Sequence, residues 1–417
     1  MSAPAGAPGP AGGAPAVDRS ALMHTYPDPA VTFARGRGTE LWDTEGRRYL
    51  DFLGGLAVTS LGHAHPRVAE ALAEQARTLL HVSNLFGTTV GPEVAVMIDT
   101  LVGDGSRAGG QVFFANSGAE ANECAIKLAR RWAGPGRYVV VSAWDSFHGR
   151  TLATLTATGQ PAKHEPFRPL PAGFAHVPYD DLGALEGALA GADVAAVLLE
   201  PIQGESGVIV PSSDFLAGAR RLCDERGALL VVDEVQTGLA RTGRWFAFQH
   251  AALRPDIVTM AKALGNGVPI GACWARSEVA AAFGPGDHGS TFGGQPLAAA
   301  AARATLQVML EIDAPSLAAR AGARLAAALA ALPGITGVRG AGLLLGAVLA
   351  EPVAGAACAA VLERGLVLNA PRPDTLRLAP PLTVTDEEID EAVQLLDEAL
   401  AATLGQGTAG TRGDGAR

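Results

Sequence analysis

Cysteine is scarce in this sequence. The 417 residues include only four cysteines, and no two of them form a Cys-x-x-Cys pair. Four widely separated cysteines do not make a disulfide scaffold in a chain of this length. Each stands among apolar residues, where a thiol usually serves as a small buried hydrophobe. This usage favours a reducing, cytoplasmic location.

Long uncharged apolar runs are also missing. The mean hydropathy is +0.21, yet no stretch of about 18 apolar residues, the length a spanning helix needs, is free of charge. The run 342–350, for example, lies between Arg339 and Glu351. The Ala/Gly/Pro-rich start has neither the basic segment nor the leucine-type core of a secretory signal. The sequence therefore predicts no membrane span and no signal peptide.

Positive charge is in deficit. Lys plus Arg total 32 against 42 Asp plus Glu, which gives a net charge of -10. Nucleic acids and anionic membranes select a basic surface, so neither is a predicted partner. A local basic pocket for an anionic small molecule stays compatible with this balance. Apolar residues make up 48% of the chain, which excludes global disorder.

Short apolar runs alternate with helical stretches through most of the chain. They are apolar at successive positions, as expected of strands covered on both faces. Strand–helix alternation predicts an α/β fold with a parallel, doubly wound sheet. The runs lie at 111–115, 138–141, 194–199, 229–232, 257–260 and 270–274.

The C-terminal part has a different pattern. Strands are expected at 342–350, 365–369 and 375–379. A helix then begins at a capping box, with Thr385 as N-cap and Glu388 bonding back to it. This arrangement predicts a smaller α+β domain.

We expect five segments along the chain. A large domain at 61–305 is followed by the small domain at 306–404, and the segment 20–60 packs with the small domain. The Gly/Ala/Pro-rich or polar ends at 1–19 and 405–417 are expected to be disordered tails.

Polar residues follow the apolar runs, at the edge where open α/β sheets bind ligands. After 111–115, Ser117 and Glu120 form a capping box at a helix start. The small residues Gly118 and Ala119 leave backbone N–H groups open, which suits a phosphate. An ordinary helix start has the same pattern.

The loop after 138–141 holds an aromatic ring, an imidazole and a guanidinium at Phe147, His148 and Arg150. Phe147 can stack on a planar ring, and Arg150 can bind a carboxylate through two parallel hydrogen bonds. The alternative is a surface loop with one packed Phe. We expect His148 to shape the pocket rather than act as a base.

Two charged residues end buried strands. Asp233 needs a positive partner, either a protonated heterocyclic nitrogen or a structural arginine. Lys262 precedes the turn Gly265-Asn266-Gly267, where Asn266 is expected to be left-handed. Desolvation lowers the pKa of such a lysine and makes it a Schiff-base nucleophile. Together with the phosphate cradle and the stacking ring, these groups match the needs of pyridoxal phosphate.

The chain resembles the class III pyridoxal-phosphate-dependent aminotransferases from about residue 41 to 382. The order and spacing of seven motifs carry this resemblance. They are Trp-Asp-Thr-Glu-Gly at 42–46, Gly-His-Ala-His-Pro at 62–66, Asn-Ser-Gly-Ala-Glu-Ala-Asn at 116–122, Phe-His-Gly-Arg-Thr at 147–151, Glu-Pro-Ile-Gln-Gly-Glu at 200–205, Asp-Glu-Val-Gln-Thr-Gly at 233–238 and Leu-Arg-Leu-Ala-Pro-Pro at 376–381.

The resemblance implies fold type I, with a mostly parallel seven-stranded sheet, and a homodimer with both active sites at the interface. It implies that Lys262 is the Schiff-base lysine and that Asp233 keeps the pyridine nitrogen protonated. The other cofactor contacts that it implies are Gly118, Ala119, Phe147, Gln236 and, from the second subunit, Thr291. The substrate contacts that it implies are Arg150, Glu205, Ser290 and Arg377.

Within the family the resemblance is closest to the branch that acts on N-acetylornithine. It implies transfer of the terminal amino group to 2-oxoglutarate, giving glutamate, by ping-pong kinetics in arginine biosynthesis. We expect Arg377 to bind the glutamate carboxylate and Glu205 to neutralise Arg377 when the other substrate is bound. No metal site is expected, because the His63 and His65 pair has no evident third ligand.

Alternatives remain open. Ornithine, succinylornithine or 4-aminobutyrate could be the donor, because specificity in this family rests on few side chains. A mutase or decarboxylase is less compatible with Glu205 and Arg377 together. A catalytically silent protein of the same fold would not need a desolvated Lys262. A nicotinamide dehydrogenase is disfavoured because no Gly-x-Gly-x-x-Gly follows an early strand.

Overall fold

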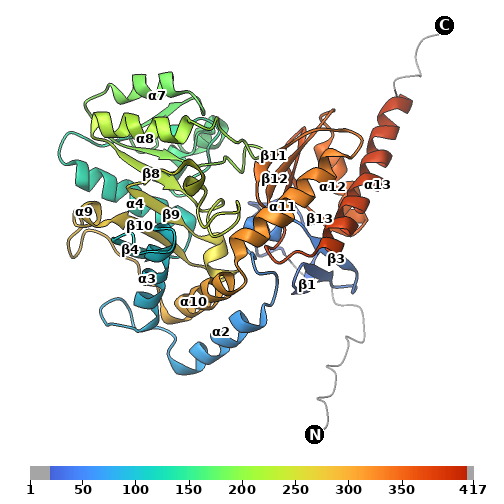
Figure 1. Ribbon diagram of the computed structural model, residues 1–417, viewed down its shortest axis with the longest axis horizontal. Helices are drawn as coiled ribbons and strands as arrows, with labels where there is room; N and C mark the ends of the chain where they lie inside the picture. Colours follow the sequence, from blue (N-terminus) through green and yellow to red (C-terminus); the bar gives the residue numbers. More distant parts are fainter. Residues whose placement is uncertain (1–18, 411–417) are drawn as a thin grey trace.

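The computed structural model describes residues 19–410 (Figure 1). The expected tails at 1–19 and 405–417 therefore lie largely outside the described residues. The last helix, α13 (Asp386–Gly410), nevertheless continues past the expected boundary at 404. No helix within the described part of the chain combines the length and the apolar composition that crossing a bilayer requires.

A seven-stranded sheet forms the centre of the larger part. Its β10 strand is antiparallel to both neighbours, and the pairings among the other strands from β9 to β6 are parallel. The expected mostly parallel α/β sheet is thus confirmed. In sheet order the strands are β4 (Gly110–Ala115), β10 (Gly271–Arg276), β9 (Ile257–Met260), β8 (Leu229–Asp233), β7 (Val194–Leu199), β5 (Val139–Ala143) and β6 (Phe174–Val177).

Six of these strands match the predicted apolar runs, and β6 was not predicted. Every residue of β7 and β8 is buried, as a strand covered on both faces requires. Along β5, Val140 belongs to a cluster that contains Leu128 of α4 (Gly118–Ala133). The next residue, Val141, belongs to a second cluster that contains Phe215 of α8 (Phe215–Arg226). Helices therefore cover both faces of the sheet.

The remaining helical elements connect the strands or cover the sheet. They are α1 (Gly54–Ala57), α2 (Pro66–Thr78), α3 (Val90–Val102), α5 (Leu152–Ala157), α6 (Pro161–His164), η1 (Glu165–Phe167), α7 (Leu182–Leu189), η2 (Ala247–Ala251), η3 (Lys262–Gly265), α9 (Ser277–Ala280), α10 (Pro296–Glu311), α11 (Ala314–Ala330) and α12 (Ala354–Glu363).

Two four-stranded sheets make up the smaller part. One has the order β11 (Ile335–Ala341), β12 (Leu344–Leu349), β15 (Thr375–Leu378) and β14 (Asn369–Arg372). The other has the order β1 (Phe33–Arg37), β2 (Glu40–Asp43), β3 (Arg48–Asp51) and β13 (Leu366–Val367). The strand predicted at 365–369 is wrong as a single element, because β13 and β14 lie in different sheets.

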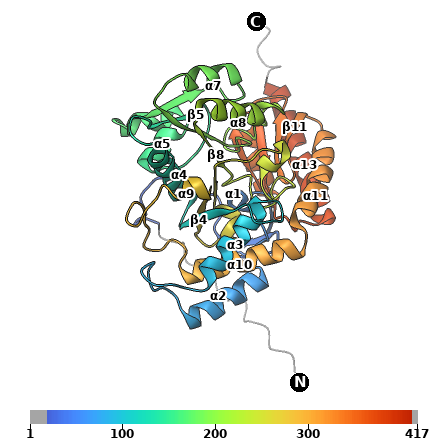
Figure 2. The same ribbon diagram turned by 60° about the vertical axis from the view of Figure 1, so that its left-hand side comes forward.

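The pairing of β3 with β13 attaches the N-terminal segment to the C-terminal part. The capping box of α13 is confirmed: Thr385 N donates to Glu388 Oε2 at 2.8 Å, and Glu388 N donates to Thr385 Oγ1 at 3.2 Å. Figure 2 shows α1 near the centre of the molecule. There Ala57 joins a small buried cluster with Ile202, Val208, Leu344 and Ala379.

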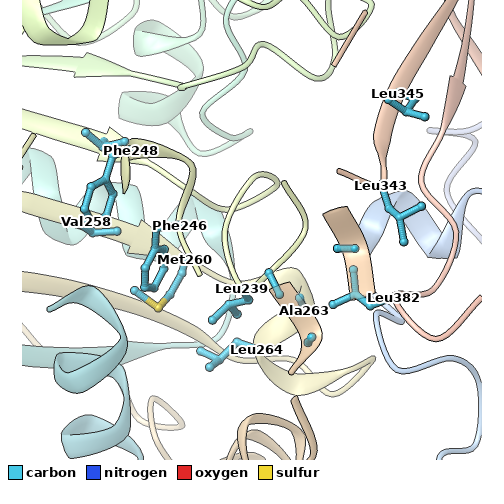
Figure 3. Packing of buried hydrophobic residues seen from close by; sticks show 14 of the residues in the cluster. Leu239, Phe246, Phe248, Val258, Met260, Ala263, Leu264, Leu343, Leu345 and Leu382 are labelled. Atoms are coloured by element: carbon cyan, nitrogen blue, oxygen red, sulfur yellow. The ribbon is translucent and has the colours of Figure 1, made fainter. Parts of the chain in front are cut away.

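One hydrophobic core runs through both parts. Figure 3 follows it from Phe248 and Val258 beside the central sheet to Leu382 and Leu343 in the smaller part. Helix α10 also crosses the expected boundary at 305/306. The division into domains stays a prediction.

Candidate active site

A cavity of about 400 Å³ opens at the carboxyl ends of strands β4, β5, β7, β8 and β9. Loops from distant parts of the sequence meet there, because parallel strands end at the same edge of a sheet. Eight of the residues expected at the site line this one cavity. They are Gly118, Ala119, Phe147, Arg150, Glu205, Asp233, Gln236 and Lys262.

The first wall of the cavity is the N-terminus of α4. Ser117 caps this helix by accepting a hydrogen bond from Glu120 N at 3.2 Å. Glu120 bonds back to Asn116 N at 2.8 Å rather than to Ser117 N. A Cβ at Gly118 would lie 2.8 Å from Val235 Cγ1, so only glycine fits there. A 16-residue helix with free N–H groups at its start favours an anion.

Asp233 lies at the end of β8 with 4% of its surface exposed. Its Oδ2 accepts from Asn122 Nδ2 at 2.7 Å and from His148 Nδ1 at 2.8 Å, and its Oδ1 accepts from Val235 N at 3.0 Å. No arginine pairs with Asp233 among residues 19–410, so the alternative of a structural arginine partner is wrong. The carboxylate is held in one orientation at the cavity wall.

Lys262 follows β9 in a left-handed backbone conformation, with φ 41°. Such a conformation is costly for a residue other than glycine and is concentrated at functional sites. Its amine makes no hydrogen bond to any residue in the described part of the chain, and it lines the cavity. Burial lowers the pKa of Lys262 to about 8, against a weaker opposing effect of Glu205. Asn266 is left-handed as expected, with φ 46°.

This lowered pKa predicts a pH-dependent reactivity of Lys262. In cofactor-free protein, the rate at which a small amine-reactive reagent labels Lys262 should rise with pH, with a midpoint at about pH 8. Only the neutral amine attacks the reagent. Lys127 and Lys163 are the only other lysines of the chain, so peptide mass spectrometry can follow all three separately. Lys127, whose Nζ bonds Asp287 O on the surface, is the internal reference. A Lys262 labelling curve centred near the ordinary lysine value would contradict the desolvated state.

Glu205 and Arg377 form an ion pair beside the cavity. Arg377 Nη1 donates to Glu205 Oε1 at 2.6 Å and to Gln236 Oε1 at 3.2 Å, while its Nε donates to Asn369 Oδ1 at 3.1 Å. Arg377 is 1% exposed, and its Nη2 has no partner among residues 19–410. Burial alone would raise the pKa of Glu205, but Arg377 and Lys262 outweigh burial and lower it.

Glu200 is a further buried carboxyl group at the cavity, for which no role was expected from the sequence. Its Oε2 accepts a hydrogen bond from Phe147 N at 2.9 Å. Burial first, and then the charge of Asp233, raise its pKa well above the ordinary value. Glu200 therefore ties the Phe147 loop to the end of β7.

Ser290 and Thr291 lie apart from this cavity. They line a second hollow with Phe113 and Glu123, and Asn116 lines both this hollow and the cavity. Ser290 Oγ accepts from Asn116 Nδ2 at 3.1 Å, and Thr291 is exposed. The expected contact of Thr291 with a second subunit's cofactor stays a prediction.

Sequence reasoning also missed the partners of Asp233. Asn122 lies one turn into α4, where its Nδ2 reaches both Asp233 and His148 O and its Oδ1 accepts from Thr259 Oγ1. His148 is fully buried, and its Nε2 has no partner within the described residues. Both residues stand inside motifs quoted for the family resemblance, which was the only signal that could have found them.

The His-x-His pair has a structural explanation. His63 Nε2 lies 2.7 Å from Asp51 Oδ2, whose other oxygen accepts from Leu53 N and Gly54 N. No group of three His, Cys, Asp or Glu side chains within residues 19–410 could hold a metal ion.

The cavity fits pyridoxal phosphate, the cofactor that the resemblance implies. A helix N-terminus at Gly118 suits its phosphate, and the ring of Phe147 suits its pyridine ring. The fixed carboxylate of Asp233, with which no arginine pairs among residues 19–410, suits a protonated ring nitrogen. The unpaired amine of Lys262 suits its aldehyde.

Known proteins resemble this chain over nearly its whole length. The class-III aminotransferase family model matches residues 22–400. The acetylornithine aminotransferase of Corynebacterium efficiens is 50% identical, over 91% of this chain and 95% of its own. The ornithine aminotransferase of Toxoplasma gondii has a TM-score of 0.88 and 36% identity, over 93% of this chain and 94% of its own. The N-acetylornithine aminotransferase of Stenotrophomonas maltophilia has a TM-score of 0.80 and 39% identity, over 92% and 99%. The chain belongs to the class-III aminotransferases.

Proposed function

We propose that this aminotransferase moves the terminal amino group of N-acetylornithine to 2-oxoglutarate, giving N-acetylglutamate semialdehyde and glutamate. The observation that carries the proposal is the ion pair between the buried Arg377 and the half-buried Glu205. Arg377 can leave Glu205 to bind a substrate carboxylate. When the substrate has no carboxylate at that end, Glu205 neutralises Arg377 again. The acetylornithine aminotransferases among the relatives support this choice of donor.

The residues of this chain hold and orient the reactants. The α4 N-terminus at Gly118 and Ala119 binds the phosphate of the cofactor, and Phe147 stacks on its ring. Asp233 keeps the ring nitrogen protonated. When bound, pyridoxal phosphate supplies an electron-withdrawing ring that stabilises negative charge at the amine-bearing carbon.

Lys262 is the proton carrier of the reaction in this proposal. With the substrate bound, the free amine of Lys262 would take a proton from the amine-bearing carbon. A pKa of about 8 suits this work, because about half of the amine is neutral near pH 8 and can take the proton, and the protonated form can return it. Gln236 contacts the ring hydroxyl, and Arg150 contacts the substrate.

Glu205→Ala is predicted to impair the two half-reactions unequally. N-acetylornithine brings a neutral methylene chain toward Arg377, which then stands buried without a counter-charge; glutamate brings its own carboxylate. The penalty for an unpaired buried charge is about 3 kcal/mol, so the N-acetylornithine half-reaction should slow by about 10²-fold, and that of glutamate far less. Single-turnover rates with each amine measure the difference. Equal losses in both would contradict the exchange of partners.

The donor is tested by absorption spectroscopy of the purified holoenzyme. N-acetylornithine, ornithine, succinylornithine and 4-aminobutyrate are added separately without a keto acid. Fastest loss of the cofactor's visible band with N-acetylornithine supports the proposal. Fastest loss with ornithine, the donor named for the Toxoplasma gondii relative, would replace the donor and keep the reaction class.

The homodimer is also part of this proposal. Leu85, Phe86 and Phe292 are large apolar side chains that stand exposed, and Thr291 precedes Phe292 in sequence. We propose that a second copy of the chain covers them and that Thr291 contacts the cofactor of that copy. Sedimentation should therefore give twice the chain mass of 42.4 kDa. A cytoplasmic location remains a prediction from the sequence.

A further inference from the structure

Two cations lie close to the ring of Phe147, which lines the cavity. The Arg150 guanidinium carbon lies 5.6 Å from the ring centroid, and Lys163 Nζ lies 5.5 Å from it. Arg150 lines the cavity and follows β5, whereas Lys163 comes from the short helix α6. Sequence reasoning singled out Arg150 and overlooked Lys163.

Neither cation has a carboxylate partner. Among residues 19–410, Arg150 makes no ion pair or hydrogen bond, and Lys163 donates only to the side-chain oxygen of Gln160. Lys163 is half-buried. Burial and the charge of Arg150 lower its pKa, and Glu205 opposes this, so the three groups share one electrostatic environment. Two neighbouring cations that lack a counter-charge repel each other unless an anion binds between them.

The choice of lysine at this position is also informative. Only three of the 32 basic residues of the chain are lysines, and the others are arginines. One lysine, Lys262, lines the cavity, and a second, Lys163, lies close to the Phe147 ring that also lines it. A lysine has a flexible stem and a compact charge, while arginine has a rigid, planar group of donors.

The proposed substrates differ in the position of their remote carboxylate. In N-acetylornithine this carboxylate lies four bonds from the reacting carbon, and in glutamate and 2-oxoglutarate it lies three bonds away. One bond is about 1.5 Å. A site that binds both must follow a carboxylate that moves by about this amount, which a rigid guanidinium alone cannot do.

We propose that Lys163 and Arg150 together bind the non-reacting carboxylate of both substrates, and that Lys163 determines specificity for substrates that carry it. The proposal rests on the proposed function for the identity of the donor. Arg150 supplies the fixed contact in both half-reactions. Lys163 moves with the carboxylate across the one-bond difference. The two cations lie close together without mutual repulsion only when the carboxylate is bound between them.

The test uses Lys163→Met, which keeps the length of the stem and removes the charge. The matched control is Lys163→Arg, which keeps the charge. Two donors are compared in the holoenzyme: N-acetylornithine and N-acetylputrescine, which differ only in the carboxylate. Glutarate, a dicarboxylate that cannot react, is titrated by calorimetry to give a readout that does not depend on turnover.

Lys163→Met is expected to lower kcat/KM for N-acetylornithine and to weaken glutarate binding by about tenfold, the worth of one charge-assisted hydrogen bond. N-acetylputrescine should change less than about twofold, and Lys163→Arg should keep most of the glutarate affinity. Equal losses with both donors, or an unchanged glutarate affinity, would overturn the proposal. A wild-type enzyme that prefers a different amine would overturn the proposed function, and the glutarate titration would still decide the role of Lys163.

Discussion

Lys262→Ala is expected to lower the rate of amino-group transfer by at least about 10⁴-fold. This large effect follows because the amine of Lys262 lines the cavity and serves two purposes in the proposed reaction. It attaches the cofactor and it carries the proton. A positioned general base alone contributes about 10² to 10⁴ in rate, and loss of the attachment adds to that.

Single-turnover measurement with saturating N-acetylornithine gives the rate of the Lys262→Ala variant. The control is Lys127→Ala, which removes a surface lysine that bonds Asp287 O and His288. That variant should retain the wild-type rate. Added methylamine should partly restore the Lys262→Ala variant, because a small amine can enter the space left by the side chain and accept the proton. A loss below about tenfold would remove Lys262 from the chemistry.

The central sheet was predictable because its strands carry an unambiguous signal. Every residue of β7 is buried, and the sequence of that strand is apolar without interruption. The edge strand β6 has mostly half-buried residues and includes His176, so its pattern resembles a loop. Strand β11 contains two glycines and is half-buried along its length, which hid it in the same way. An apolar sequence with few interruptions made a strand recognisable, and complete burial on both faces, as in β7 and β8, gave the clearest signal.

The candidate site was predictable to the extent that its residues follow strand ends. Asp233 and Lys262 were found because a charge at the end of an apolar run is unusual. The contacts around these two residues could not be predicted, because they depend on which helices pack against the ends of the strands. Asn122 reaches Asp233 from 111 positions earlier in the chain. Lys163 stands in no motif, and only the folded chain brings it to Phe147.

Arg241 shows the same limit away from the cavity. It is fully buried with no ion pair among residues 19–410, and burial lowers its pKa to about 9. Its guanidinium donates to Leu343 O at 3.1 Å, to Ser60 Oγ at 2.9 Å and to Pro380 O. One side chain therefore connects the large sheet region with the N-terminal segment and the C-terminal part. Nothing in its sequence neighbourhood distinguishes it from a surface arginine.

Asp233→Asn is expected to have the second largest effect on the reaction. The amide keeps the shape of the carboxylate but removes the negative charge that holds a proton on the cofactor ring nitrogen. Removing one partner of a buried ion pair costs about 3–5 kcal/mol, which corresponds to a rate loss of about 10²- to 10⁴-fold. The hydrogen bond from His148 should weaken as well, because an amide oxygen is a poorer acceptor than a carboxylate.

Glu234 provides a matched control for Asp233 in the next position of the chain. It is 1% exposed, but it accepts from Phe248 N at 2.8 Å and from Thr237 Oγ1, away from the cavity. Burial raises the pKa of Glu234 to about 7, so part of the carboxyl group is protonated at neutral pH. Glutamine resembles this protonated form. Glu234→Gln should therefore keep the transfer rate within about threefold, while Asp233→Asn loses it. Similar losses in the two variants would mean that buried negative charge near β8 maintains the fold, and that Asp233 has no special role toward the cofactor.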